Sequence, residues 1–172
     1  MEANIKQEIA QSIAALHLPP YDEIPDVGLF LDQTAKYVSE YLKPLQETAL
    51  TGSMVSNYVK QKLIPGPVKK SYSQESLAYL IILSYIKTAM SLEDIRLMKK
   101  VQEDSYTISV TYDYFCDEME NLLQYVCGLR DVPAVIGTSH SQEKELMRTA
   151  LLSITYKIYL DQYLALIRAE KK

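Results

Sequence analysis

Residues 50–98 read LTGSMVSNYVKQKLIPGPVKKSYSQESLAYLIILSYIKTAMSLEDIRLM, and this stretch decides the expected fold. Thr51 is a candidate N-cap, because its hydroxyl can accept a backbone N–H that the first helical turn leaves unpaired. A short helix over residues 53–62 is therefore expected. Pro65-Gly66-Pro67 cannot continue that helix, so residues 64–72 are expected to form a tight turn or a short β-ribbon. An apolar helix over residues 73–89 follows.

Helical periodicity extends over most of the remaining chain, where apolar residues recur at intervals of three and four. Further helices are expected over residues 3–16, 29–42, 91–104, 107–129 and 141–169. Residues 21–27, which contain Pro25, are expected to be an extended linker. Five Gly and seven Pro in 172 residues leave little material for a fold of strands and turns. Composition and periodicity therefore both favour the mostly-α class.

The net charge of −4 conceals a division along the chain. Residues 51–100 hold eight basic and three acidic side chains, whereas residues 1–50 hold three and eight, and residues 101–172 hold seven and eleven. Between Thr51 and Tyr72 there are four lysines and no acidic residue. Such a local basic patch on an acidic protein is typical of a polyanion site, although a patch of this size also arises by chance.

The helix expected over residues 53–62 has two unlike sides. The side that can pack inward carries Met54, Val55, Tyr58 and Val59. The opposite side, at spacings of three and four, carries Ser53, Ser56, Asn57 and Lys60. Serine and asparagine can read base edges in a major groove, and lysine can meet a phosphate. An ordinary amphipathic surface helix would show the same pattern, so the interpretation depends on the neighbouring segments.

The turn after this helix carries Lys69 and Lys70 near its tip, and Tyr72 follows directly. Two ammonium groups beside a polar helix would contact the same duplex backbone that the helix approaches. Contacts of this kind give an affinity that depends on salt and not on base sequence. A solvated loop is the alternative interpretation of the turn.

The order of these segments resembles the DNA-binding half of MerR-type transcriptional regulators. In that family an Arg-Tyr-Tyr helix leads through a Gly-Leu-Leu-Pro step into a wing, a Tyr-Ser pair, and a helix closed by Ser-Leu-x-Glu-Ile. The corresponding segments here are SNYVKQKLIP, a basic turn, YSQESLAYLIIL and SLEDIRLM. Residues 24–98, which include IPDVGLFLDQ, more closely resemble a bacterial family of unknown function whose members carry this MerR-like region.

The sequence also departs from the MerR pattern. Ser56 stands where arginine is common, Asn57 occupies the first aromatic position, and Lys62 stands where glycine is usual. The connection over residues 42–50 is longer than the usual tight turn. Base preference is therefore not carried over from the family.

The resemblance implies a mostly α, MerR-like winged helix-turn-helix with a short β-wing over residues 28–104. An N-terminal helix and linker at 1–27 and a C-terminal helical region at 105–172, which serves packing or dimerisation, complete the expected chain. The implied function is that of a bacterial transcriptional regulator that binds double-stranded DNA as a homodimer. The candidate DNA-contacting residues are Thr51, Ser53, Ser56, Asn57, Tyr58, Lys60, Lys62, Lys69, Lys70 and Tyr72.

Two alternatives stay open at this point. Tyr58 and Tyr72 could equally be core residues with hydroxyls that face solvent. The whole unit could also be a protein-interaction module that keeps the winged-helix fold and has lost DNA binding. The serine at position 56, in place of the usual arginine, supports that second alternative.

Other functional classes receive no support from the sequence. It has no phosphate-cradling glycine loop and no nucleophile elbow, so no enzymatic activity and no cofactor are expected. Cys116 and Cys127 would lie about 16 Å apart on one helix, too far for a disulfide, and are expected to be reduced thiols without a metal. The acidic residues of this helix are expected on a solvated face, and they are Asp113, Asp117, Glu118 and Glu120.

The sequence also bears on the cellular location of the protein. The most apolar run, residues 77–86, is shorter than the roughly 20 residues of a membrane span, and residues 1–10 lack the pattern of a secretory signal. We therefore expect a cytoplasmic protein.

Seven of the 14 tyrosines lie beyond residue 105. Core and interface packing is one interpretation of these tyrosines, and a pocket for an aromatic or cationic small-molecule effector is the other.

Overall fold

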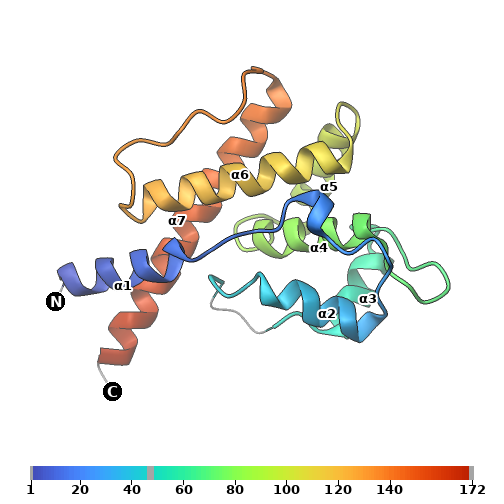
Figure 1. Ribbon diagram of the computed structural model, residues 1–172, viewed down its shortest axis with the longest axis horizontal. Coiled ribbons are helices and arrows are strands. Elements are labelled where there is room, and N and C mark those ends of the chain that lie inside the picture. Colours follow the sequence, from blue (N-terminus) through green and yellow to red (C-terminus); the bar gives the residue numbers. More distant parts are fainter. Residues whose placement is uncertain (1, 46–48, 171–172) are drawn as a thin grey trace.

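The computed structural model describes residues 2–45 and 49–170, and helices joined by loops make up this part of the chain (Figure 1). Its elements are α1 (Glu2–Ala14), η1 (Tyr21–Glu23), α2 (Leu31–Glu40), α3 (Gly52–Lys60), α4 (Gln74–Ile86), α5 (Leu92–Glu103), α6 (Ile108–Val126) and α7 (Gln142–Glu170). No β-strand occurs among these residues, which confirms the mostly-α class. The linker expected to be extended begins instead with the 3-10 helix η1, closed by the Ile24 N–H, which donates to the Tyr21 carbonyl.

The helix starts follow the capping chemistry of the sequence. The Thr51 hydroxyl accepts the Met54 N–H at 3.2 Å, and the Ser91 hydroxyl accepts the Asp94 N–H at 3.1 Å. Ser73 caps α4 in the same way, through the N–H of Ser76. Each hydroxyl replaces an acceptor that the first helical turn lacks, which is why α3, α4 and α5 begin where the sequence predicts.

The core is built around α4. Ten of its 13 residues are buried, and it packs against α2, α6 and α7. Buried polar groups on this helix find partners nearby: the Ser84 hydroxyl donates to the Leu80 carbonyl at 2.7 Å, and the Tyr85 hydroxyl donates to the Tyr41 carbonyl at 2.6 Å. With its polar groups satisfied, α4 can be covered on all sides without a large energetic penalty.

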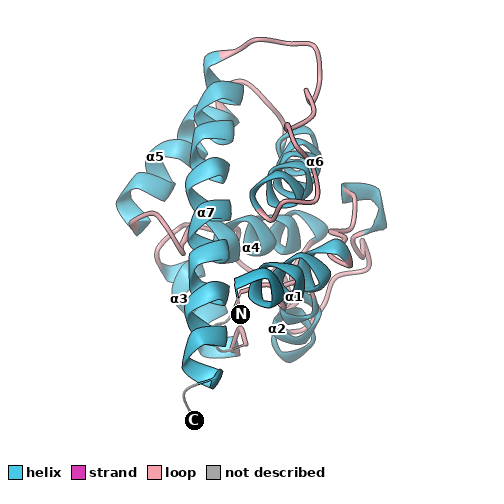
Figure 2. Cartoon of the chain, turned by 90° about the vertical axis from the view of Figure 1, so that its left-hand side faces the viewer, coloured by secondary structure: helices cyan, strands magenta, loops and turns pink. Residues whose placement is uncertain are grey.

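The remaining helices occupy two ends of the molecule. In Figure 1, α1 and the C-terminal part of α7 lie at one end, whereas α3 and the turn that follows it lie at the other. The long helix α7 extends along much of the molecule and packs on both α1 and α6 (Figure 2). The terminal helices therefore leave the α3 end uncovered.

Two expectations are corrected by the structure. The expected β-wing contains no strand pair: residues 64–72 form a turn held by two isolated antiparallel bridges, Val68–Ser71 and Leu29–Tyr72. Glu118, expected on a solvated face, is fully buried, because α7 packs across this side of α6. Arg148 of α7 lies over it, with Nη1 3.0 Å from Glu118 Oε1.

Other features of the chain agree with the sequence. Cys116 and Cys127 are free and buried, and burial raises the pKa of the Cys127 thiol to about 11. None of the helices in the described part combines the length and the apolar character that crossing a membrane requires.

Candidate nucleic-acid interface

Helix α3 is packed against α2 by a close approach of the Gly52 backbone to the Leu31 side chain. A Cβ added to Gly52 would lie 3.1 Å from Leu31 Cγ, so the Leu31 side chain would have to shift to make room for it. The Leu50 N–H donates to the Ser39 hydroxyl at 3.1 Å, which ties the start of α3 to the body of α2. Residues 46–48, in the connection that is longer than in the MerR pattern, lie outside the described residues. The packing directs Val55 and Tyr58 inward.

The polar side of α3 faces solvent, as the sequence predicts. Ser53, Asn57 and Lys60 are exposed, and Thr51 is exposed beside them at the N-cap. Ser56 is only half-buried, but its hydroxyl is engaged by a neighbour described below. The exposed polar side chains are therefore free to contact a ligand that lies along α3.

Lys69 and Lys70 form the tip of a two-residue turn. The Val68 N–H donates to the Ser71 carbonyl at 3.0 Å, and the Ser71 N–H donates back to the Val68 carbonyl at 2.9 Å. Between them Lys69 and Lys70 have φ values of 49° and 66°. Positive φ at both central residues defines a type I′ turn, for which asparagine and glycine are the preferred residues. Both lysines are exposed.

The base of this turn is anchored on two sides. Tyr72 and Leu29 exchange backbone hydrogen bonds of 2.8 and 3.0 Å, which joins the turn to the segment before α2. Gly28 makes this approach possible, because it has φ 67° and a Cβ there would lie 2.2 Å from the Ser71 Oγ. The Ser76 hydroxyl donates to the Pro65 carbonyl at 3.2 Å. The turn is therefore held in one position relative to α2 and α4.

Tyr58 and Tyr72 are core residues, with exposed fractions of 6% and 4%. Burial raises the pKa of Tyr72, while a hydrogen bond with the Ser56 hydroxyl acts in the opposite direction. That contact links the middle of α3 to the base of the turn.

Lys62 closes α3 in a left-handed conformation, with φ 57°. The Leu63 N–H donates to the Tyr58 carbonyl at 3.0 Å, and the Lys62 N–H donates to the Val59 carbonyl at 3.0 Å. This pair of bonds is a Schellman motif, in which glycine is the usual residue at the position that Lys62 occupies.

Replacement of Lys62 by glycine is expected to stabilise the protein by about 1 kcal/mol, because a left-handed residue with a Cβ is strained by about that amount. Urea denaturation monitored by circular dichroism measures the change. Lys62→Ala is the matched control, since it removes the charge and keeps the Cβ. An equal gain in the alanine variant would show that the charge, and not the backbone, is the cause.

Arg96 of α5 was not predicted as part of this surface. Its Nε donates to the Gln61 carbonyl and its Nη2 to Gln61 Oε1, both at 3.2 Å. An exposed guanidinium is thereby placed at the C-terminal end of α3. Gln61, to which it bonds, lies between Lys60 and Lys62 in the sequence. The contact joins residues 35 positions apart, so nothing in the local sequence signals it.

The charge of this surface is one-sided. Lys60, Lys62, Lys69 and Lys70 are all exposed, and none forms an ion pair with another residue in the described part of the chain. The segment that carries them has no acidic residue to neutralise it. Unpaired cations on an uncovered surface attract anions, and the attraction is sensitive to salt.

The fold and this surface define a mostly helical protein with an uncovered, lysine-bearing end. The chain belongs to the family described as Domain of unknown function (DUF1836), which matches residues 19–115. The matched region contains α2 to α5 and the lysine-tipped turn, whereas α1, α7 and the second half of α6 lie outside it. No curated protein and no solved structure matches the chain.

Proposed function

We propose that this protein is a bacterial, cytoplasmic, non-enzymatic regulator of transcription that binds double-stranded DNA through α3 and the turn over residues 64–72. In this proposal the two elements form a MerR-like winged helix-turn-helix. The exposed side of α3 enters the major groove, and the turn contacts the adjoining phosphate backbone.

One observation carries the proposal. In the described part of the chain, the non-glycine residues with positive φ are Lys62, Lys69 and Lys70. Glycine or asparagine would be less strained at each position, so local stability does not account for the lysines. Strained residues that persist in a fold point to a function that needs their side chains. Three exposed ammonium groups at one end of the molecule suit a polyanion.

A groove-facing helix beside these cations favours duplex DNA as the polyanion. Ser53 and Asn57 carry small polar side chains that can bond to base edges, and Lys60 can reach a phosphate. Ser56 is less suited to base contact, because it is half-buried. Arg96 stands at the C-terminal end of α3, and in this proposal it adds a further phosphate contact.

The proposal includes a homodimer. Tyr156, Leu160 and Leu164 are exposed on α7 and recur every four residues, so they form one apolar stripe along the helix. A second copy of α7 would cover such a stripe. A twofold dimer would present two copies of α3 to two operator half-sites.

The test is an electrophoretic shift assay with genomic fragments at about 50 and about 200 mM salt. If the four lysines each meet a phosphate, affinity per protomer falls about a hundredfold over this range; the Lys69→Asn/Lys70→Gly variant, which keeps two of the contacts, loses only about tenfold. Asparagine and glycine suit the type I′ turn, so the variant keeps the fold and removes only the charge. Absent or salt-insensitive binding by the folded protein would favour the protein-interaction module instead.

A further inference from the structure

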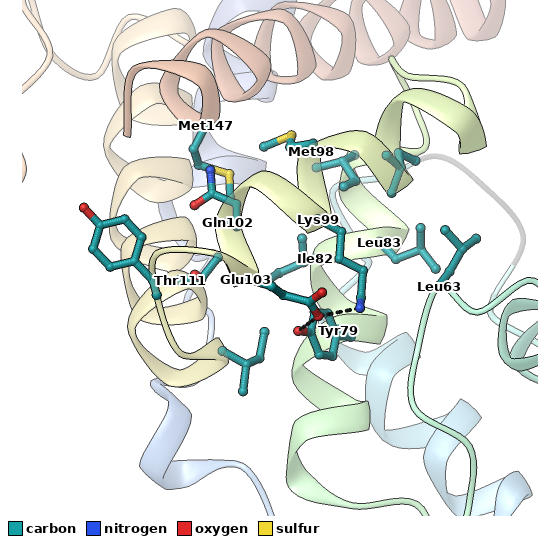
Figure 3. A pocket seen from close by; sticks show the side chains of 14 residues that line it. Leu63, Tyr79, Ile82, Leu83, Met98, Lys99, Gln102, Glu103, Thr111 and Met147 are labelled. Atoms are coloured by element: carbon teal, nitrogen blue, oxygen red, sulfur yellow. Dashed lines mark hydrogen bonds and ion pairs between the residues drawn. The ribbon is translucent and has the colours of Figure 1, made fainter. Parts of the chain in front are cut away.

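A partly open pocket lies where the end of α5 and the start of α6 meet the start of α7 and the loop that precedes it. Its volume is about 100 Å³, and its lining residues are Gln102, Tyr106, Val110, Thr111, Tyr114, Gly137, Ser139 and Lys144. Gln102 and Thr111 also line a separate space of about 40 Å³ (Figure 3). That space is far smaller than the roughly 150 Å³ of a cavity that holds one benzene ring. The pocket of 100 Å³ is therefore the better candidate for a ligand site.

Lys144 supplies the charge of this pocket. Its side chain is half-buried, and its Nζ donates to the Ser139 carbonyl at 3.0 Å and lies 5.5 Å from the centre of the Tyr114 ring. Within the part of the chain that the structure describes, Lys144 forms no ion pair. An ammonium group has three donors, so two of them remain for a ligand.

The carboxylates closest to this region are engaged elsewhere. Glu118 pairs with Arg148, whose Nη1 lies 3.0 Å from Glu118 Oε1. The Glu143 carboxylate accepts a hydrogen bond of 2.9 Å from the Ser105 hydroxyl. The Lys144 ammonium is therefore a partly buried charge without a counterion, and an anion bound beside it would lower the cost of its burial.

Two hydroxyl groups on the α6 side of the pocket lack partners. Thr111 is only 7% exposed, and its hydroxyl has no hydrogen-bond partner among the described residues. The buried Tyr114 hydroxyl has none there either. A buried hydroxyl without a partner is unfavourable and calls for an explanation. Because both residues line the pocket, an acceptor bound in it can satisfy both hydroxyls.

The loop on the other side leaves room at the ammonium group. Gly137 has φ 69°, and a Cβ at this position would lie 3.2 Å from the Lys144 Nζ. A side chain here would be strained and would crowd the charge. Glycine therefore keeps the space next to Lys144 open.

We infer that this pocket binds a small monocarboxylate of the size of acetate or propionate. The Lys144 ammonium pairs with the carboxylate, and the hydroxyls of Thr111 and Tyr114 donate to its oxygens. The alkyl group packs on Val110 and on the ring of Tyr106, which line the same pocket. One lysine and largely apolar walls suit a single negative charge better than the higher charge of phosphate. Aromatic acids are excluded by size, because even one ring needs more than this volume.

The experiment titrates the full chain with sodium acetate, at constant ionic strength, while the backbone amides are followed by nitrogen-15 NMR. We expect saturable shifts at Gly137, Ser139 and Lys144, and none at Lys69 and Lys70, which report nonspecific anion binding. Acetamide has nearly the same shape as acetate and no charge. Acetate is expected to bind at least about tenfold more tightly, because acetamide lacks the charge-assisted bond to Lys144.

Three variants test the assigned contacts. Lys144→Met keeps the apolar stem and removes the charge, so the preference for acetate over acetamide should disappear. Tyr114→Phe and Thr111→Val each remove one hydroxyl and keep the shape, and each should weaken acetate binding about tenfold. The matched control is Lys157→Met, which removes a partly exposed lysine further along α7 and should leave acetate binding unchanged. Amide signals away from the pocket check the folding of each variant.

The outcomes are distinct. The absence of saturable shifts at Gly137, Ser139 and Lys144 would overturn the ligand site, as would an unchanged preference for acetate in Lys144→Met. Tighter binding of phosphate or of benzoate than of acetate would overturn the assignment to a small monocarboxylate. Since none of these measurements involves DNA, the ligand site and the proposed function stand or fail separately.

Discussion

Replacement of both Lys69 and Lys70 by glutamate is expected to weaken binding to duplex DNA at least about a hundredfold. Each lysine at the tip of the turn would lose a charge-assisted contact of about 1.5–3 kcal/mol, and two such losses exceed a factor of about 100. The introduced carboxylates also repel the phosphates. Because the turn is exposed and its hydrogen bonds come from Val68 and Ser71, the fold should survive.

Fluorescence anisotropy with a labelled duplex measures this loss. The matched control is Lys6→Glu/Arg168→Glu, which changes the net charge by the same amount on exposed sites of α1 and α7, at the other end of the molecule. The control should keep most of the affinity. An equal loss in both variants would mean that net charge, and not the lysine-tipped turn, governs binding.

Replacement of Arg148 by methionine is expected to destabilise the protein by about 3–5 kcal/mol at pH 7. Glu118 is fully buried, and Arg148 Nη1 lies 3.0 Å from its Oε1. Methionine keeps the apolar part of the side chain and leaves the carboxylate uncompensated, which is the costly way to break a buried pair. Urea denaturation gives the difference.

The control for this variant is Lys157→Met, which breaks the exposed pair between Lys157 and Asp161 on the same helix. Exposed pairs contribute about 0–1 kcal/mol, so this change should be small. In the Arg148→Met background, the further change Glu118→Leu should restore most of the stability. A loss of less than about 1 kcal/mol in Arg148→Met would show that the buried carboxylate does not need its partner.

The pH dependence follows from the same pair. Burial raises the pKa of Glu118 above its usual range, and the charge of Arg148 opposes this shift. The Glu118 carboxyl group therefore stays protonated to a higher pH in the folded protein than in the unfolded chain. As a result, the free energy of unfolding falls as the pH rises through the folded-state pKa of Glu118. Arg148→Met raises the pKa further. The difference in the free energy of unfolding between wild type and Arg148→Met should become smaller at acidic pH.

The sequence predicted the helices and the exposed side of α3 because both depend on local periodicity and on caps such as Thr51 and Ser91. It did not predict the burial of Glu118, because the polar side of α6 does not reveal that α7 will cover it. Arg96 was missed for a similar reason, since its contact with Gln61 depends on how α5 packs.

The backbone around the three left-handed lysines was predicted only in part. Residue type argues against positive φ at Lys62, Lys69 and Lys70, and no left-handed residue was expected there. A tight turn was expected at residues 64–72, but its backbone type depends on the paired carbonyls of Val68 and Ser71, which no local pattern specifies.

The pairing of Leu29 with Tyr72 joins two points 43 residues apart in the chain. A hairpin with a single bridge of its own is too small to be stable in water. The conformation of the turn therefore depends on its pairing with the segment that precedes α2. A synthetic peptide that covers only α3 and the turn would lack this partner and would sample many conformations. The lysines acquire their fixed positions late, after distant parts of the polypeptide have met.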